Sequence, residues 1–133
     1  MPTILVPGNI DFLVTGPLDN ARRLFPGRPF HVHNAAITVV RTTREEIEIL
    51  ARTIAARCNE ALGPVKILVP IAGFSAFDSQ GGPLYDPEAP QLFANTLQEY
   101  LDRKINLNLL PYHINDFEFS RAILEALNQM LSA

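Results

Sequence analysis

Strand-like and helix-like segments alternate along the chain after residue 37, and this alternation constrains the fold more than any other feature of the sequence. Apolar, β-prone runs at residues 37–40, 66–71 and 105–110 are each followed by a segment with helical spacing of apolar residues. Successive strand, helix and strand units place their strands in parallel and their helices on the faces of the sheet. The sequence therefore predicts a single Rossmann-like, three-layer α/β domain over residues 1–133, with a mainly parallel sheet of four to five strands.

The first helical segment has the clearest start signal. Thr43 and Glu46 have the spacing of a capping box, in which each side chain accepts a hydrogen bond from the other residue's backbone N–H. Apolar residues then recur every three or four positions as far as Leu62. Gly63 and the proline after it predict the end of this helix.

The other two helices have weaker start signals. Asp86 precedes a proline and predicts an N-cap, although Pro90 also allows a start at Ala89. Asn115 and Glu118 have capping-box spacing and predict the start of the last helix.

The N-terminal third of the chain is less regular. Residues 3–6 predict a short buried strand, and residues 11–29 predict a loop with a short helix over residues 18–24. The β-prone segments 29–33 and 37–40 are consistent with one kinked strand or with two short strands.

Composition excludes several classes of protein. The net charge of −3 and the pI near 5.5 argue against a nucleic-acid partner. Cys58 is the single cysteine, which excludes an internal disulfide, and its apolar neighbours at helical spacing predict a core position. The apolar runs are too short to span a membrane, and the first 15 residues lack a basic segment typical of signal peptides. We therefore expect a soluble, cytoplasmic protein without a membrane partner.

Polar side chains follow almost every predicted strand. The carboxyl ends of parallel strands meet at one edge of a sheet, where α/β proteins bind ligands and where helix N-termini favour anions. The sequence therefore predicts a small-molecule site at this edge. Its candidate ligand-binding and anion-binding residues are Asn9, Asp11, His33, Asn34, Arg41, Thr42, Thr43, Gly73, Ser75 and Asp78.

Two of these residues have competing interpretations. Arg41 lies beside a capped helix start, which suits a phosphate or carboxylate, but it could equally pair with a nearby acid. Ser75 lies in a segment similar to the G-x-S-x-G elbow of hydrolases, yet the last glycine and the immediate helix are missing. Ligand hydrogen bonding or a loop turn is therefore favoured for Ser75 over nucleophilic catalysis.

One histidine is predicted to take part in catalysis. His113 with Asp116 is the candidate catalytic pair for proton transfer, because it follows the last strand and imidazole titrates near neutral pH. A metal could in principle be bound by His31, His33, His113 and Asp11, but the spacing does not support this, and no metal site is predicted. The sequence contains neither a Walker A motif nor G-x-G-x-x-G.

Several short motifs occur in a fixed order along the chain, and together they are more specific than any one alone. They are Pro7 to Asp11 with Gly16-Pro17, His33-Asn34, Arg41-Thr42-Thr43 with Glu45, Gly73, Ser75 and Asp78 with Asp86 to Ala89, and His113 to Asp116. In these motifs the chain resembles the second half of a module in an uncharacterised bacterial, fungal and plant family. That family includes the plant tobamovirus-resistance protein, an inhibitor of viral RNA replication whose N-terminal region binds ATP.

The resemblance implies a function and also limits it. It implies a small-molecule or nucleotide-binding domain, with ATP and Mg²⁺ as the implied cofactors. The first half of the module is absent from this chain, and Ala35, Ala36 and Phe117 stand where the family pattern has proline. The domain would then pair with a separate first half or with itself as a homo-oligomer. Two alternatives stay open: half of an enzyme or binding module, or a structural domain whose polar edge is buried against another subunit.

Overall fold

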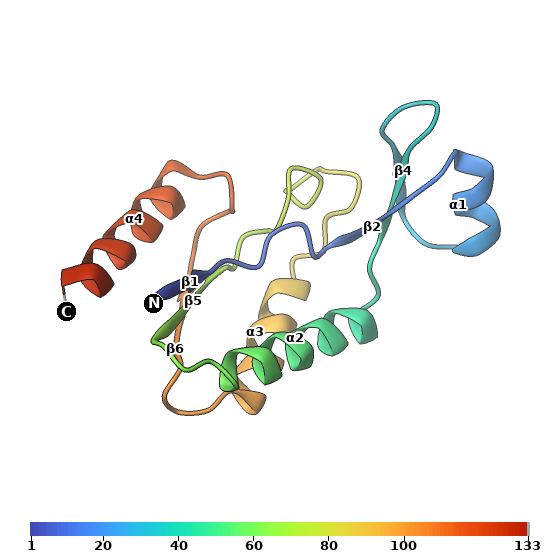
Figure 1. Cartoon of the computed structure of the whole chain (residues 1–133). Helices are drawn as coiled ribbons and strands as arrows, with labels where there is room; N and C mark the ends of the chain where they lie inside the picture. Colours follow the sequence, from blue (N-terminus) through green and yellow to red (C-terminus); the bar gives the residue numbers. More distant parts are fainter. Residues whose placement is uncertain (133) are drawn as a thin grey trace.

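The computed structural model describes residues 1–132, which form two three-stranded sheets and four helices (Figure 1). The first sheet is parallel and has the order β1 (Thr3–Leu5), β5 (Val65–Pro70) and β6 (Asn106–Leu110). Helix α4 (Phe117–Ser132) follows the last strand of this sheet.

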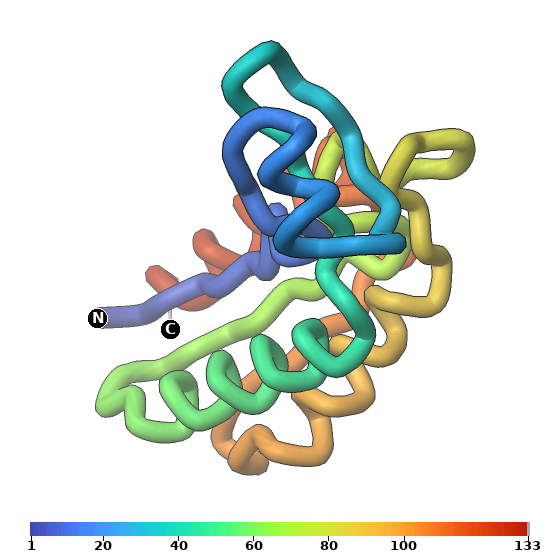
Figure 2. Tube along the Cα trace, turned by 90° about the vertical axis from the view of Figure 1, so that its right-hand side faces the viewer, coloured from blue at the N-terminus to red at the C-terminus, as the bar shows by residue number. Residues whose placement is uncertain are grey.

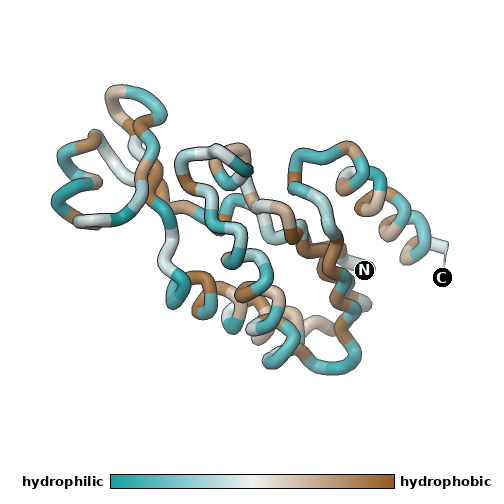
Figure 3. The backbone as a smooth tube through the Cα atoms, turned by 180° about the vertical axis from the view of Figure 1, so that it is seen from behind, coloured by the Kyte–Doolittle hydropathy of each residue, from teal (hydrophilic) through white to brown (hydrophobic). Residues whose placement is uncertain are grey.

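The parallel sheet lies at the centre of three layers. Helices α2 (Arg44–Asn59) and α3 (Ala89–Tyr100) lie side by side on one face, as Figures 1 and 2 show, and α4 lies on the other. In the central strand, Ile67 and Val69 pack toward α2 and α3, whereas Leu68 packs with α4. Because both faces are covered, β5 is apolar almost throughout, and Figure 3 shows hydrophobic residues along it.

The second sheet is antiparallel and has the order β2 (Phe12–Thr15), β4 (Thr38–Arg41) and β3 (Phe30–Val32). Helix α1 (Leu18–Leu24) contacts β4.

The predicted mainly parallel sheet of four to five strands is therefore wrong in its strand count. What the structure contains is a mixed α/β fold whose parallel sheet has three strands. Residues 38–41 pair with β2 and β3 instead, because the chain turns back sharply between β3 and β4. The side-chain oxygen of Asn34 closes that turn by accepting hydrogen bonds from the N–H groups of Ala36 and Ile37.

Strand β2 was not predicted from the sequence, which favours a loop at these residues. It is only four residues long and is flanked by glycine and proline positions, so its short apolar run gives little strand signal. In the β3 and β4 region the structure contains two short strands, one of the two arrangements with which the sequence is consistent.

Helix starts follow local capping. At α2 the predicted capping box is confirmed: Thr43 Oγ1 accepts from Glu46 N–H at 3.1 Å, and Glu46 Oε2 accepts from Thr43 N–H at 2.8 Å. Helix α3 begins at Ala89, the later of the two predicted starts. Helix α4 begins at Phe117, so the predicted N-cap at Asn115 is wrong by one residue.

Among residues 1–132, no helix combines the length and the apolar character needed to cross a membrane.

Candidate functional site

The loop of residues 71–88, between β5 and α3, connects the two sheets. On one side Phe74 lies in the core against Phe93, with ring centroids 5.6 Å apart. On the other side the ring of Phe77 lies 5.4 Å from Phe12 and 5.0 Å from His31, both on strands of the antiparallel sheet. The loop is therefore a packed joint between the sheets, visible in Figure 1 as the yellow-green segment.

Asp78 holds this loop in shape. Its two carboxylate oxygens each accept a backbone hydrogen bond of 3.1 Å, one from Phe74 N–H and one from Asp86 N–H. Gly73 has φ of +141°, and a Cβ there would lie 2.0 Å from the Asp78 carbonyl oxygen. Only glycine fits this position, which explains why a glycine follows the strand.

The hydroxyl of Ser75 is used within the protein. It donates to Asp11 Oδ2 at 2.6 Å and accepts from Phe77 N–H at 3.1 Å. His113 contacts the backbone oxygen of Ser75 rather than its hydroxyl. The serine hydroxyl therefore has a carboxylate partner but no histidine base.

Three charged side chains meet beside Ser75. Arg41 Nη1 lies 3.4 Å from Asp78 Oδ1 and 3.7 Å from Asp11 Oδ2. The arginine side chain is 7% exposed and the two aspartate side chains are 0% exposed. We call Asp11, Arg41 and Asp78 the charge cluster; with both carboxylates ionised its formal charge is −1.

The charge cluster makes few hydrogen bonds although its three side chains are buried. Arg41 Nη1 lies within ion-pair distance of both carboxylates, but none of the three guanidinium nitrogens makes a hydrogen bond to a described residue. Asp11 Oδ1 and Thr38 Oγ1 also lack a partner among residues 1–132. Buried polar groups are normally hydrogen-bonded, so these atoms are the least satisfied in the described part of the chain.

Burial raises the pKa of Asp11 above its usual value. The nearby Asp78 carboxylate adds to this effect, whereas the hydrogen bond from Ser75 and the charge of Arg41 oppose it. Loss of hydration is the largest contribution, because a charged carboxylate away from water must be compensated by close partners.

His113 ties the loop after β6 to the loop after β5. Its Nδ1 accepts from Asn115 N–H at 3.1 Å, and its Nε2 lies 2.9 Å from the Ser75 carbonyl oxygen. These contacts assign the neutral tautomer with hydrogen on Nε2, because a carbonyl can only accept. Asp116 Oδ2 accepts from His113 N–H at 2.8 Å.

Most of the predicted site residues lie near one another, around the loops that follow β1, β5 and β6. Asn9 N–H donates to the Phe74 carbonyl, and Thr42 Oγ1 donates to the Ile10 carbonyl at 3.0 Å. Thr43 caps α2. His33 and Asn34 do not join the group, because they lie in the exposed turn between β3 and β4 that projects from the sheet in Figure 1.

Two residues of this region were not predicted from the sequence. Thr38 is a fully buried threonine next to three buried residues of β4, and Phe77 packs the loop onto the antiparallel sheet. A polar residue inside the apolar run 37–40 was the available signal for Thr38. No local signal identified Phe77, because its partners come from two other strands.

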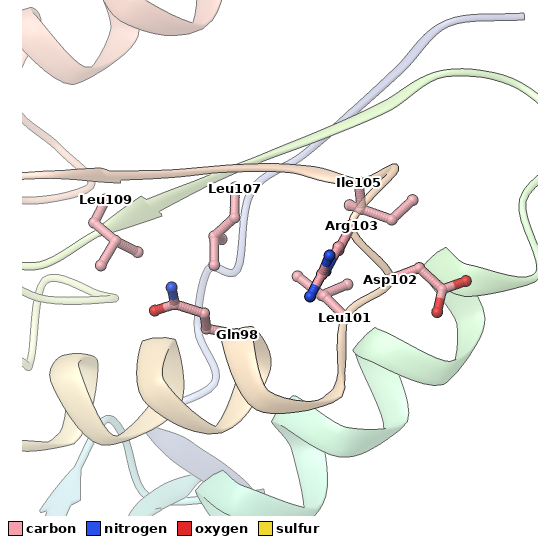
Figure 4. Close-up of a pocket in the computed structure, with 7 residues that line it drawn as sticks. All are labelled: Gln98, Leu101, Asp102, Arg103, Ile105, Leu107 and Leu109. Carbon is pink, nitrogen blue, oxygen red and sulfur yellow. The ribbon is translucent and has the colours of Figure 1, made fainter.

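Cavities lie elsewhere on the domain. A groove of about 410 Å³ runs between the end of α3 and the edge strand β6, and Figure 4 shows Leu107 and Leu109 of that strand along it. None of the predicted site residues lines this groove. Within residues 1–132, no three His, Cys, Asp or Glu side chains are grouped so that they could hold a metal ion.

Comparison with known proteins finds one family across almost the whole chain. Residues 1–131 match "Uncharacterised protein family (UPF0261) C-terminal domain". The chain is 35% identical to the ToMV resistance protein Tm-1(GCR237) and 33% identical to the ToMV susceptible protein tm-1(GCR26), both of Solanum lycopersicum. It is 31% identical to a UPF0261 protein of Clostridium tetani.

These relatives are much longer than this chain. The alignments cover 95%, 98% and 98% of the chain, but 17%, 18% and 33% of the three relatives. The chain thus spans a third or less of their length. Since one tomato relative is named for resistance and the other for susceptibility, similarity to both does not assign either property to this domain.

Proposed function

Because the chain belongs to the uncharacterised protein family UPF0261, matching its C-terminal domain, we propose that it supplies one wall of a small-molecule or nucleotide site. The site lies at the carboxyl ends of the parallel strands, with an anion site at Arg41. In this proposal the three-stranded parallel sheet is the Rossmann-like part of a larger unit.

The observation that carries the proposal is the buried guanidinium of Arg41 without a hydrogen-bond acceptor. Arginine has five N–H donors in a planar fork that suits carboxylate and phosphate oxygens. The two nearby carboxylates supply charge at 3.4 and 3.7 Å but no hydrogen bonds to it. An oxygen-rich ligand group is the chemistry that best completes such a side chain.

The position of Arg41 supports the same conclusion. It lies at the end of β4, next to the loops that follow β1 and β5, and ligands of open α/β sheets bind outside the carboxyl ends of strands. In the proposed site Ser75 and Asp78 fix a polar part of the ligand. His113 and Asp116 are the pair that we assign to proton transfer if the site carries out a reaction.

ATP with Mg²⁺ is the first ligand to test, because the resemblance implies a nucleotide. The longer relatives contain additional chain that would supply the rest of a nucleotide site. We place this function in the cytoplasm, since the single cysteine is free and buried.

Isothermal titration of ATP and Mg²⁺ tests the nucleotide part. It should be applied to this chain and to the full-length Clostridium tetani relative. Heat with the relative alone would support a site shared between two parts of the protein. Absence of heat with both would contradict nucleotide binding.

An arginine substitution tests the anion site in this chain. Arg41→Gln should weaken binding of an oxyanion ligand by roughly tenfold or more, because a charge-assisted bidentate contact is lost. Arg121→Gln, at an exposed position of α4, is the matched control and should bind like the wild type. Equal affinity of both variants, measured by titration after circular dichroism confirms folding, would contradict a role for Arg41 in binding.

A second candidate function is assembly, supported by an exposed apolar stripe on α4. Phe117, Leu124 and Leu131 recur at seven-residue intervals on this helix and are exposed, as is Leu127. Large exposed apolar patches usually mark contact surfaces. In this candidate α4 packs against a second copy of the chain or against a separate first-half domain.

Light scattering separates the two candidates. A homodimer of the wild type that dissociates in Leu124→Glu would support assembly through α4. The control is Val14→Glu, at an exposed apolar position of β2, which should remain a dimer. A monomeric chain that binds ligand would favour the first candidate.

A further inference from the structure

We infer that binding of an oxyanion at Arg41 is coupled to the uptake of one proton by Asp11. This inference rests on the proposed anion site and adds the linked protonation. It follows from the charges that surround Arg41 and from the different hydrogen bonding of the two carboxylates.

The charge balance of the cluster opposes an incoming anion. Asp11 and Asp78 are both fully buried and both lie within 4 Å of Arg41 Nη1. With both ionised, the cluster already has one more negative than positive charge. A dianion would add two further negative charges in a region where water screens poorly, so binding is favoured when one carboxylate is neutral.

The hydrogen bonds identify Asp11 as the group that takes the proton. Both carboxylate oxygens of Asp78 already accept a backbone N–H, so neither can take a proton without disturbing a hydrogen bond. Asp11 accepts from the Ser75 hydroxyl through Oδ2, whereas its Oδ1 has no partner among residues 1–132. A proton can therefore be added at Asp11 Oδ1 without breaking an existing hydrogen bond.

The surrounding groups are consistent with this assignment. Asp11 is faced by Arg41 from β4 and by Asp78 and Ser75 from the loop of residues 71–88. Burial raises the pKa of Asp11, which favours its protonated form relative to an exposed aspartate. In the linked step, Oδ1 gains a proton from solvent and the ligand keeps its charge; the new O–H can then donate to an oxygen of the anion.

Sulfate is the probe that tests the coupling, because it does not itself titrate between about pH 5 and about pH 8. Calorimetric titration in two buffers with different ionisation enthalpies counts the protons taken up. We expect uptake of up to one proton per sulfate, and an affinity that falls by up to roughly tenfold for each unit of rising pH.

Asp11→Asn is the decisive variant. Its neutral amide imitates the protonated carboxyl, so sulfate should bind without proton uptake and more tightly than to the wild type at the upper end of the pH range. Asp19→Asn, at an exposed position in the first turn of α1, is the matched control and should keep the pH dependence of the wild type.

The failures of the two proposals are distinguishable. Sulfate binding at Arg41 without proton uptake in the wild type would overturn the coupling and leave the proposed function standing. No sulfate binding at any pH in the range would overturn the anion site itself. If Asp11→Asn does not fold, the two-buffer measurement on the wild type decides alone.

Discussion

Asp11, Arg41 and Asp78 place three charged groups inside the domain, and the Arg41 guanidinium makes no hydrogen bond to a described residue. Buried ion pairs gain from mutual attraction but lose hydration, and the balance is favourable only when the remaining polar atoms are also satisfied. Here the arginine nitrogens and one aspartate oxygen are not satisfied by described residues. The cluster is therefore a weak source of stability, and its charged state should depend on pH.

Stability against pH tests this conclusion at Asp11. Because burial raises the folded-state pKa above the ordinary 3.8, the unfolded chain ionises this group at lower pH than the folded protein does. The contribution of Asp11 to the free energy of unfolding should therefore fall as pH rises from about 3.8 through the folded-state pKa of this group. The fall should be about 1.4 kcal/mol for each pH unit that separates the two pKa values.

Urea unfolding of the wild type and of Asp11→Asn at several pH values measures this contribution. The stability of the wild type relative to the variant should decrease with rising pH. A relative stability that increases with pH would mean that pairing with Arg41 outweighs burial. Asp19→Asn, at an exposed site, controls for the general effect of removing a carboxylate.

Helix α2 shows how much a local signal can determine at the scale of one element. Glu46 closes the capping box with Thr43 and also receives two hydrogen bonds from Arg28, at 2.8 and 3.0 Å. Burial alone would raise the pKa of Glu46, but the hydrogen bonds from Arg28 and Thr43 lower it overall. The stabilisation is present at neutral pH and is lost as pH falls through the folded-state pKa.

Removal of the N-cap tests the contribution of the capping box. Thr43→Ala should lower the free energy of unfolding by about 1 kcal/mol, because the N–H of Glu46 loses its acceptor. Thr43→Ser keeps the hydroxyl and should stay close to the wild type in urea unfolding. An equal loss in both variants would show that the methyl group of Thr43, and not its hydroxyl, stabilises the helix.

At the scale of the whole molecule, the two sheets are connected through the loop of residues 71–88. Phe77 packs against Phe12 and His31 of the antiparallel sheet, while Phe74 anchors the same loop in the core beneath the parallel sheet. The charge cluster lies at this junction, since Arg41 belongs to β4 and Asp78 to the loop.

Phe77→Ala should loosen this junction. We expect a loss of roughly 2 kcal/mol, less than the 3–5 kcal/mol typical of a fully buried phenylalanine, because the side chain is only partly buried. In native-state hydrogen exchange, the amides of β2, β3 and β4 should lose more protection than those of β5 and β6. Leu62→Ala, at a fully exposed position, is the control, and a uniform loss over both sheets would contradict a separable junction.

The sequence alone determined those features that depend on residues close to one another along the chain. The capping box of Thr43 and the buried strand β5 were predicted, because capping and apolar runs act over a few residues. Only the tertiary structure decided which strands pair. Residues 38–41 are β-prone in either sheet, and the long-range partners β2 and β3 assign them to the antiparallel one. The same holds for the charge cluster. Asp11, Arg41 and Asp78 were each predicted as site residues, one at a time. Their burial and their short mutual distances come from packing between segments that are far apart in sequence.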